Sequence, residues 1–396
     1  MLALRANADA GFRRVVGIGG IGSGIVFALD GDQTLGRNES RLGTLLDARD
    51  YCKLHIVEHY IARLMDASPS GPPFHVVALG VVGDDEVGHQ MVRDMDEAGI
   101  DTRLVRKDAA TRTLFSVCFV YSDSSGGNIT TSNSAAAALS VDDLRQVQDL
   151  LREAGSHGIA LCLPEVPMKT RREFLTLAMD SGSYVAASFA SAELIEARDT
   201  GMLSNIDLLA INKDEAAALV QSHVPLQGKG AVPVVGAPDG DSGTAALISA
   251  CARMLTAQRP DMRIVVTAGS RGAYGFEAGA WDFCPAPKVL AVSTAGAGDA
   301  LLAGVICSLA SGVPFISETP ASAKDWHIWS TGGFSERQSR SALDFGVLLA
   351  AYTVQSPHTI HPDATLEALL AFASSLGVSF GGELAAALQV QRVAAR

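Results

Sequence analysis

The sequence is poor in basic residues and has no long apolar run. Its 396 residues include 31 Lys and Arg against 43 Asp and Glu, which gives a formal net charge of −12. Binding along a nucleic acid backbone needs a basic surface, so we expect no nucleic acid partner. No apolar stretch reaches the roughly 18 to 20 residues of a membrane span, and residues 1–14 lack the apolar core of a secretory signal. We therefore expect no membrane partner either.

Cysteine is scarce and scattered. The six cysteines form no Cys-x-x-Cys pair, which argues against a zinc ribbon or a disulfide framework. Cys118, Cys162 and Cys307 lie inside apolar runs, where reduced thiols are common in protein cores. These features predict a cytoplasmic protein.

What the sequence does contain is an alternation of short apolar runs with longer segments of helical period. Such alternation predicts an α/β fold: a mostly parallel, doubly wound sheet with helices on both faces, in three α/β/α layers. Ligands of such sheets bind at the carboxyl ends of the strands. We predict strands over residues 14–18, 75–79, 159–163, 184–188, 208–211 and 264–267. We predict helices over residues 43–66, 86–98, 141–154, 169–181, 191–200, 213–221, 245–257, 299–311, 339–353 and 364–375.

Two regions interrupt the alternation within what we take as a single domain over residues 1–396. Residues 114–121, followed by a Ser/Gly turn and residues 128–131, have the pattern of a β-hairpin with no helix attached. Residues 24–32 form a similar extended stretch. We expect segments around 22–40 and 111–133 to form a small β-sheet lid, and residues 318–337 to be an insertion.

Residues 17–22 (Gly-Ile-Gly-Gly-Ile-Gly) match the dinucleotide-binding fingerprint. That fingerprint should open a helix of ten or more residues, yet Asp30-Gly31-Asp32 interrupts the chain soon afterwards. The context of the fingerprint is therefore wrong for a dinucleotide site, and we expect these glycines to let a substrate-side loop leave the first strand. A dinucleotide-dependent oxidoreductase is kept as an alternative.

The most informative segment is residues 293–299 (Ser-Thr-Ala-Gly-Ala-Gly-Asp), which precedes an apolar helix. Small residues at a helix N-terminus expose backbone N–H groups, and the helix dipole adds positive potential, so the segment is suited to an anion. A carboxylate there is unusual. It is either an ordinary residue of the first helical turn or a base that takes a proton from a hydroxyl while the amides hold a phosphoryl group.

Several segments in this order resemble the ribokinase-like, pfkB carbohydrate kinase family over roughly residues 13–370. Residues 294–299 are similar to the family's Asp-Thr-x-Gly-Ala-Gly-Asp signature, and residues 212–215 (Asn-Lys-Asp-Glu) to its Asn-x-x-Glu element. Supporting similarities lie at residues 82–88, 98–102 and 267–272 and in the strand after Thr113.

The resemblance implies a kinase that transfers the γ-phosphoryl of ATP to a sugar hydroxyl, with Mg²⁺, in a homodimer that associates through the lids. It implies Asp299 as catalytic base, with Gly296, Ala297 and Gly298 as the anion hole. Asn212 and Glu215 would organise Mg²⁺ and the phosphates, and Thr267, Gly269 and Thr294 would lie beside the nucleotide. Substrate contacts are expected from Asp30, Asp32, Asn38 and Glu165.

Two departures from the family pattern leave questions open. Ser293 replaces the usual acidic residue that helps to hold a monovalent cation, so K⁺ dependence is open. The usual Gly-Gly-x-x-x-Asn is reduced to residues 35–41, which leaves the sugar unidentified. A nucleoside kinase and a non-catalytic sugar or nucleotide sensor on the same fold remain alternatives. His358 and His361, beside Pro357, are expected to belong to a loop near the nucleotide or cation pocket rather than to a zinc site.

Overall fold

The computed structural model describes residues 2–6, 11–31, 33–122, 126–221, 242–317 and 338–394. The expected insertion at residues 318–337 and the candidate substrate residue Asp32 lie outside these ranges.

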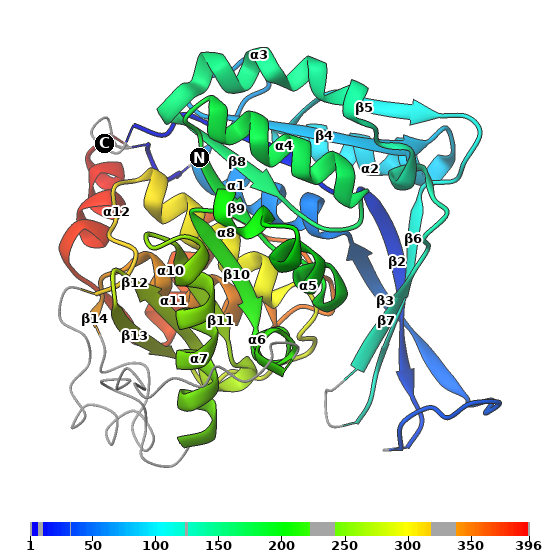
Figure 1. Cartoon of the computed structure of the whole chain (residues 1–396). Coiled ribbons are helices and arrows are strands. Elements are labelled where there is room, and N and C mark those ends of the chain that lie inside the picture. Colours follow the sequence, from blue (N-terminus) through cyan, green and yellow to red (C-terminus); the bar gives the residue numbers. More distant parts are fainter. Residues whose placement is uncertain are drawn as a thin grey trace.

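A nine-stranded sheet forms the centre of the molecule (Figure 1). It is parallel from β5 to β11, and β12 and β13 extend it as an antiparallel hairpin. The central strands are buried along almost their whole length, as expected for parallel strands covered on both faces. Across the sheet the strands are β13 (Ala280–Pro285), β12 (Gly272–Glu277), β11 (Arg263–Thr267), β10 (Leu208–Asn212), β9 (Tyr184–Ala187), β8 (Gly158–Cys162), β1 (Arg14–Ile18), β4 (His75–Gly83) and β5 (Asp101–Asp108).

Helices cover both faces of this sheet and build one apolar core against each (Figure 1). One face carries α3 (Arg145–Ala154), α4 (Met168–Asp180), α5 (Ser191–Asp199), α6 (Lys213–Gln221) and α7 (Ser242–Gln258). The other carries α1 (Lys53–Met65), α2 (Glu86–Ala98), α8 (Ala297–Ala310), α10 (Ala342–Thr353), α11 (Leu366–Ser375) and α12 (Gly382–Ala394). The prediction of three α/β/α layers with a mostly parallel sheet is confirmed. Two short strands, β14 (Gln338–Ser339) and β15 (Ser379–Phe380), pair separately.

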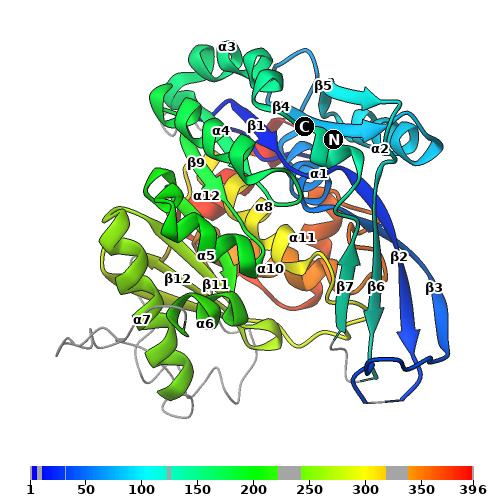
Figure 2. The same cartoon turned by 45° about the vertical axis from the view of Figure 1, so that its right-hand side comes forward.

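A second, four-stranded sheet projects from the side of the molecule as a lid (Figure 2). Its strands lie in the order β3 (Gly43–Tyr51), β2 (Gly22–Leu29), β6 (Leu114–Val120) and β7 (Gly126–Thr130). The expected hairpin is β6 with β7. The prediction of a helix over residues 43–66 is wrong for its first part, because residues 43–51 form β3 and the helix begins only at Lys53.

The glycine-rich residues 17–22 join β1 directly to the lid strand β2, and no helix follows them. A Cβ at Gly22 would lie 2.2 Å from the carbonyl oxygen of Leu114, so close packing of β2 on β6 requires the glycine. Residues 17–22 therefore do not form the strand-to-helix turn of a dinucleotide site. Among the residues described above, no helix is both long and apolar enough to cross a bilayer.

Candidate active site

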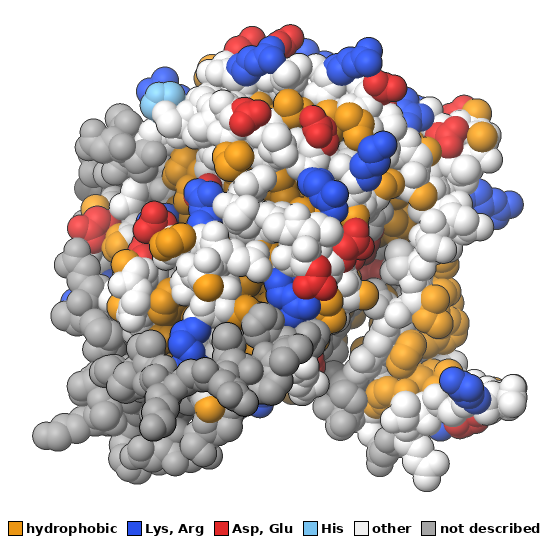
Figure 3. Space-filling model, in the orientation of Figure 1, with side chains coloured by type: hydrophobic (Ala, Val, Ile, Leu, Met, Phe, Trp, Pro, Cys, Tyr) orange, Lys and Arg blue, Asp and Glu red, His pale blue; other side chains and the backbone are white. Residues whose placement is uncertain are grey.

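Two cavities meet at the start of α8. One, of about 300 Å³, lies under the lid and is bordered by Asp50, Lys53, Glu165 and Asp299. The other, of about 430 Å³, runs along α8 and α10 and is bordered at its polar end by Thr267, Gly269, Ala297 and Gly298. Thr294 borders both cavities. We call them the lid cavity and the helix cavity. Figure 3 shows the hollow between the lid and the main body.

The loop between the cavities is shaped by Gly296, which is the N-cap of α8. Gly296 has a left-handed φ of 79°, and a Cβ there would lie 2.3 Å from the carbonyl oxygen of Thr359. Only glycine satisfies both constraints. The N–H groups of Gly298 and Asp299 belong to the first turn of α8 and have no acceptor within the helix. A Cβ at Gly298 would meet no protein atom within 4 Å.

Asp299 projects from this first turn toward the end of the lid strand β3. Its Oδ1 lies 3.5 Å from Nζ of Lys53, the first residue of α1. Burial raises the pKa of Asp299, and the nearby Lys53 ammonium only partly offsets this effect. The Asp299 carboxylate in turn raises the pKa of Lys53. The pair is therefore an acid with a raised pKa next to a stable cation.

Two further carboxyl groups face the lid cavity. Glu165 follows β8 with a left-handed φ of 75°, which turns its side chain into the cavity. Its Oε2 is buried and has no hydrogen-bond partner among the described residues, and burial raises its pKa to about 7. Asp50 accepts hydrogen bonds from the hydroxyl of Ser116 and, at 3.2 Å, from the thiol of Cys118. Burial raises the pKa of Asp50 as well.

Asn212 and Glu215 form a reciprocal pair of hydrogen bonds at the N-terminus of α6. The Asn212 N–H donates to Oε2 of Glu215, and the Glu215 N–H donates to Oδ1 of Asn212, both at 2.8 Å. Burial raises the pKa of Glu215, and Lys53 and Asp299 also influence it electrostatically. This is a helix-capping role, and it stands beside the role toward Mg²⁺ that the family resemblance implies. The described ranges contain no cluster of three His, Cys, Asp or Glu suited to a metal ion.

The helix cavity has one polar and one apolar end. Thr267 ends β11, and Gly269 follows it with a left-handed φ of 59°. The opposite wall is apolar and comes from Leu301, Val347 and Ala351. Such a cavity suits a ligand with a flat apolar part and an anionic part directed at the α8 N-terminus.

The structure does not bring the N-terminal candidates to either cavity. Asp30 and Asn38 are exposed beyond the ends of β2, on the outer turn of the lid, and Asn38 has a left-handed φ of 62° typical of a turn. Neither residue borders the lid cavity. Their substrate role stays a prediction that this arrangement does not support.

Asp50 and Lys53 border the lid cavity, where contacts from Asp30 and Asn38 were expected. The sequence analysis did not single out Asp50 or Lys53. The start of α1 reads Tyr51-Cys52-Lys53 and lacks the Gly-Gly-x-x-x-Asn pattern. One signal was available. The apolar spacing of three to four residues holds from Tyr51 onward but fails between Leu46 and Tyr51, which places the start of the helix near residue 52.

The chain is similar in sequence to known proteins. A family model described as "pfkB family carbohydrate kinase" matches residues 59–366. A fructokinase of Klebsiella pneumoniae is 28% identical over 276 residues, which cover 67% of this chain and 80% of that protein.

The fold is also found among solved structures. A ribokinase of Giardia lamblia matches with a TM-score of 0.64 at 15% identity, covering 87% of this chain and 94% of that one. A ribokinase of Cryptococcus neoformans var. grubii serotype A, solved in complex with ADP, matches with a TM-score of 0.62 at 18% identity, covering 91% and 99%. At these identities the structural matches show a ribokinase-like fold and no more.

Proposed function

The chain belongs to the pfkB family of carbohydrate kinases, and from this premise we propose that it transfers the γ-phosphoryl of ATP to a hydroxyl of a sugar bound in the lid cavity. The single observation that carries the proposal is the position of residues 294–299 between the two cavities. A phosphate chain in the helix cavity would end at the amides of the loop, and a hydroxyl in the lid cavity would reach them from the other side.

In the proposed mechanism, Asp299 accepts the proton of the attacking hydroxyl. The oxygen attacks the γ-phosphorus, the bond to the β-phosphate bridging oxygen breaks, and ADP leaves with that electron pair. The amides of the first turn of α8 stabilise the charge on the transferred phosphoryl group. Lys53, next to Asp299, favours the ionised carboxylate and so keeps the base ready.

Mg²⁺, when bound with ATP, would neutralise phosphate charge. Glu215 fits a metal held through water, because only its Oε2 is occupied by the Asn212 N–H, while Mg²⁺ retains several waters and needs few carboxylates. Oδ1 of Asn212 already caps α6, so we assign Asn212 chiefly to holding Glu215 in place.

The lid cavity supports a monosaccharide as substrate. A volume of about 300 Å³ lies at the lower end of small-molecule sites. Among the described residues, its charged border consists of three carboxyl groups, Asp50, Glu165 and Asp299, and one cation, Lys53, which disfavours an already phosphorylated sugar. Because a similar protein is named fructokinase, free fructose is the first sugar to test.

We also propose a homodimer that associates through the lids. Leu42, Leu45 and Ile129 are large apolar residues on the lid that remain exposed, and contiguous apolar surface is typical of contact regions. Figure 3 shows apolar side chains along the lid.

All six cysteines are free thiols, which supports a reducing location such as the cytoplasm.

The test is an ADP-release assay with ATP and Mg²⁺ over a panel of free hexoses, pentoses, sugar phosphates and nucleosides. We expect turnover with a free sugar, none with the sugar phosphates, and none in Asp299→Asn. Turnover restricted to nucleosides would replace the proposal with a nucleoside kinase. A thermal shift with sugar or ATP, without any turnover across the panel, would favour the sensor.

A further inference from the structure

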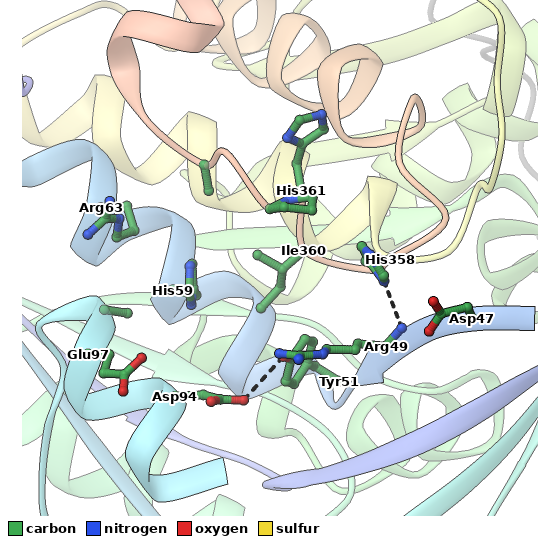
Figure 4. A pocket seen from close by; sticks show the side chains of 13 residues that line it. Asp47, Arg49, Tyr51, His59, Arg63, Asp94, Glu97, His358, Ile360 and His361 are labelled. Carbon is green, nitrogen blue, oxygen red and sulfur yellow. Dashed lines mark hydrogen bonds between the residues drawn. The ribbon is translucent and has the colours of Figure 1, made fainter. Parts of the chain in front are cut away.

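A third cavity, of about 590 Å³, lies beside the end of β3 (Figure 4). Its wall is formed by the end of β3, by α1 and α2, and by residues 358–364. No residue of the proposed chemistry borders it. We propose that this cavity is a separate binding site for a phosphorylated sugar, whose occupancy changes the affinity of the lid cavity for its substrate.

The cationic part of the site comes from Arg49 and Arg63. The guanidinium of Arg63 has no hydrogen bond or ion pair among the described residues, although the side chain is only half-exposed. Arg63 lies one helical turn after His59, so both side chains project from the same face of α1 toward the cavity (Figure 4). Arg49 comes from β3 and Arg63 from α1, and a guanidinium group can bind a phosphate through paired N–H groups.

His59 provides a neutral polar group beside Arg63. Its Nδ1 is buried without a hydrogen-bond partner in the described part of the chain, and burial lowers the pKa of His59 to about 3. A neutral imidazole carries one N–H donor and one acceptor nitrogen, so it can bond either a phosphate oxygen or a hydroxyl.

Carboxylates on the same wall determine the rest of the ligand. Asp94 is already occupied, since it accepts hydrogen bonds from the Tyr51 hydroxyl at 3.2 Å and from Gln90 at 2.6 Å. Glu97 and Asp47 are exposed at the rim and have no such partners within the described residues. Carboxylates repel a bare anion but accept hydrogen bonds from hydroxyls. Arginines together with free carboxylates therefore favour a ligand that joins a phosphate to several hydroxyls.

The site is connected to the lid cavity through β3. Successive side chains of a strand point to opposite faces, so Arg49 borders the third cavity whereas Asp50 borders the lid cavity. Tyr51 borders both. A ligand that binds Arg49 therefore contacts the same strand that carries a side chain of the substrate cavity.

The loop at residues 358–359 extends this connection to α8. His358 Nδ1 accepts from the Arg49 N–H at 2.8 Å, and Thr359 Oγ1 accepts from the Tyr51 N–H at 2.9 Å. The Thr359 N–H donates to the Arg49 carbonyl at 3.1 Å, and the Thr359 carbonyl packs against Gly296. A ligand that binds one conformation of this loop and strand more tightly than another changes the substrate affinity of the lid cavity if the two conformations also differ in their affinity for the substrate.

The experiment is calorimetric titration of the full chain with fructose 6-phosphate, with inorganic phosphate and with free fructose as separate arms. We expect the sugar phosphate to bind, Arg63→Gln to weaken that binding by about tenfold or more, and Arg63→Lys to restore part of it. The matched control is Arg172→Gln, at an exposed arginine of α4, which should bind as the wild type does. Because binding is the readout, the result does not depend on turnover.

A kinetic arm tests the coupling. The sugar phosphate should change the substrate KM of the wild type by about fivefold or more, and it should leave KM unchanged in Arg63→Gln, whose kcat without the effector equals that of the wild type. Undiminished binding by Arg63→Gln, equal affinity for inorganic phosphate alone, or an unchanged KM in the wild type would each overturn the proposal.

Discussion

The ammonium nitrogen of Lys53 lies 3.5 Å from Oδ1 of Asp299, although the two residues are 246 positions apart. Lys53 begins the helix that follows the lid strand β3, and Asp299 lies in the first turn of α8. The contact therefore joins the lid side of the molecule to the loop between the two cavities. Among the described residues, Lys53 is the one lysine or arginine on the border of the lid cavity, and it lies beside the carboxylate that we propose as the base.

Replacing Lys53 by Met should move the acid limb of the pH–rate profile to higher pH. The cation lowers the pKa of Asp299, so its removal raises that pKa further, and more of the base is then protonated at a given pH. We expect kcat at neutral pH to fall by up to about 10²-fold. The measurement is kcat/KM against pH for the wild type, Lys53→Met and Lys53→Arg, in which the charge is kept. A profile of Lys53→Met that overlays the wild type would remove Lys53 from the mechanism.

Replacing Gly296 or Gly298 by alanine should change the stability of the protein by different amounts. Gly296→Ala meets both a left-handed φ and the Thr359 carbonyl at 2.3 Å, so we expect a loss of about 1 to 3 kcal/mol in the free energy of unfolding. Gly298→Ala meets no protein atom within 4 Å, so its stability should stay within about 0.5 kcal/mol of the wild type.

Activity separates the two variants further. The Cβ of Gly298→Ala would occupy space that the proposal gives to the phosphoryl group, so its kcat should fall by about 10²-fold despite normal stability. Chemical denaturation and turnover measured on the same preparations check both statements. Full activity in Gly298→Ala would argue that no ligand approaches this backbone closely.

The layers of the fold could be predicted from the sequence because their physical cause is local. Parallel strands covered on both faces must be apolar throughout, and β8 and β10 are short apolar runs that lie between helical segments. The lid hairpin β6–β7 could equally be predicted, since the sequence between its two strands is rich in serine and glycine. The carboxylate and glycines of residues 296–299 stood out for the same reason, as a local pattern at a helix start.

The rest of the site depends on contacts between distant segments. Strand β3 is exposed along most of its length, so it has no continuous apolar run that would distinguish it from the helix that follows. Because the sequence predicts a helix over residues 43–66, it does not place Asp50 and Lys53 in a cavity. The pairing of Lys53 with Asp299, and of β3 with residues 358–359, exists only in the folded chain.

The buried Glu58 of α1 should make the protein less stable as pH rises. Glu58 is fully buried, neither of its carboxyl oxygens has a partner among the described residues, and burial raises its pKa well above 4.5. Above pH 4.5 the unfolded chain loses this proton while the folded chain keeps it, so the folded state binds more protons and stability falls with rising pH. Below pH 4.5 both states are protonated, and the effect vanishes.

Glu58→Gln, which cannot ionise, should therefore gain in Tm over the wild type as the pH is raised from about 5 to about 8. Glu173→Gln, at an exposed position of α4, is the control and should show a constant difference. Thermal unfolding at several pH values measures both. A difference between Glu58→Gln and the wild type that does not change with pH would contradict a buried, protonated carboxyl group.

The most direct test of the account is single-turnover transfer of the γ-phosphoryl from ATP to the sugar by Asp299→Asn, with both ligands saturating. The account predicts that the variant folds and binds both ligands as the wild type does, while the rate of transfer falls by about 10² to 10⁴-fold. Transfer at a rate near that of the wild type would show that Asp299 is not the base, and would contradict the mechanism.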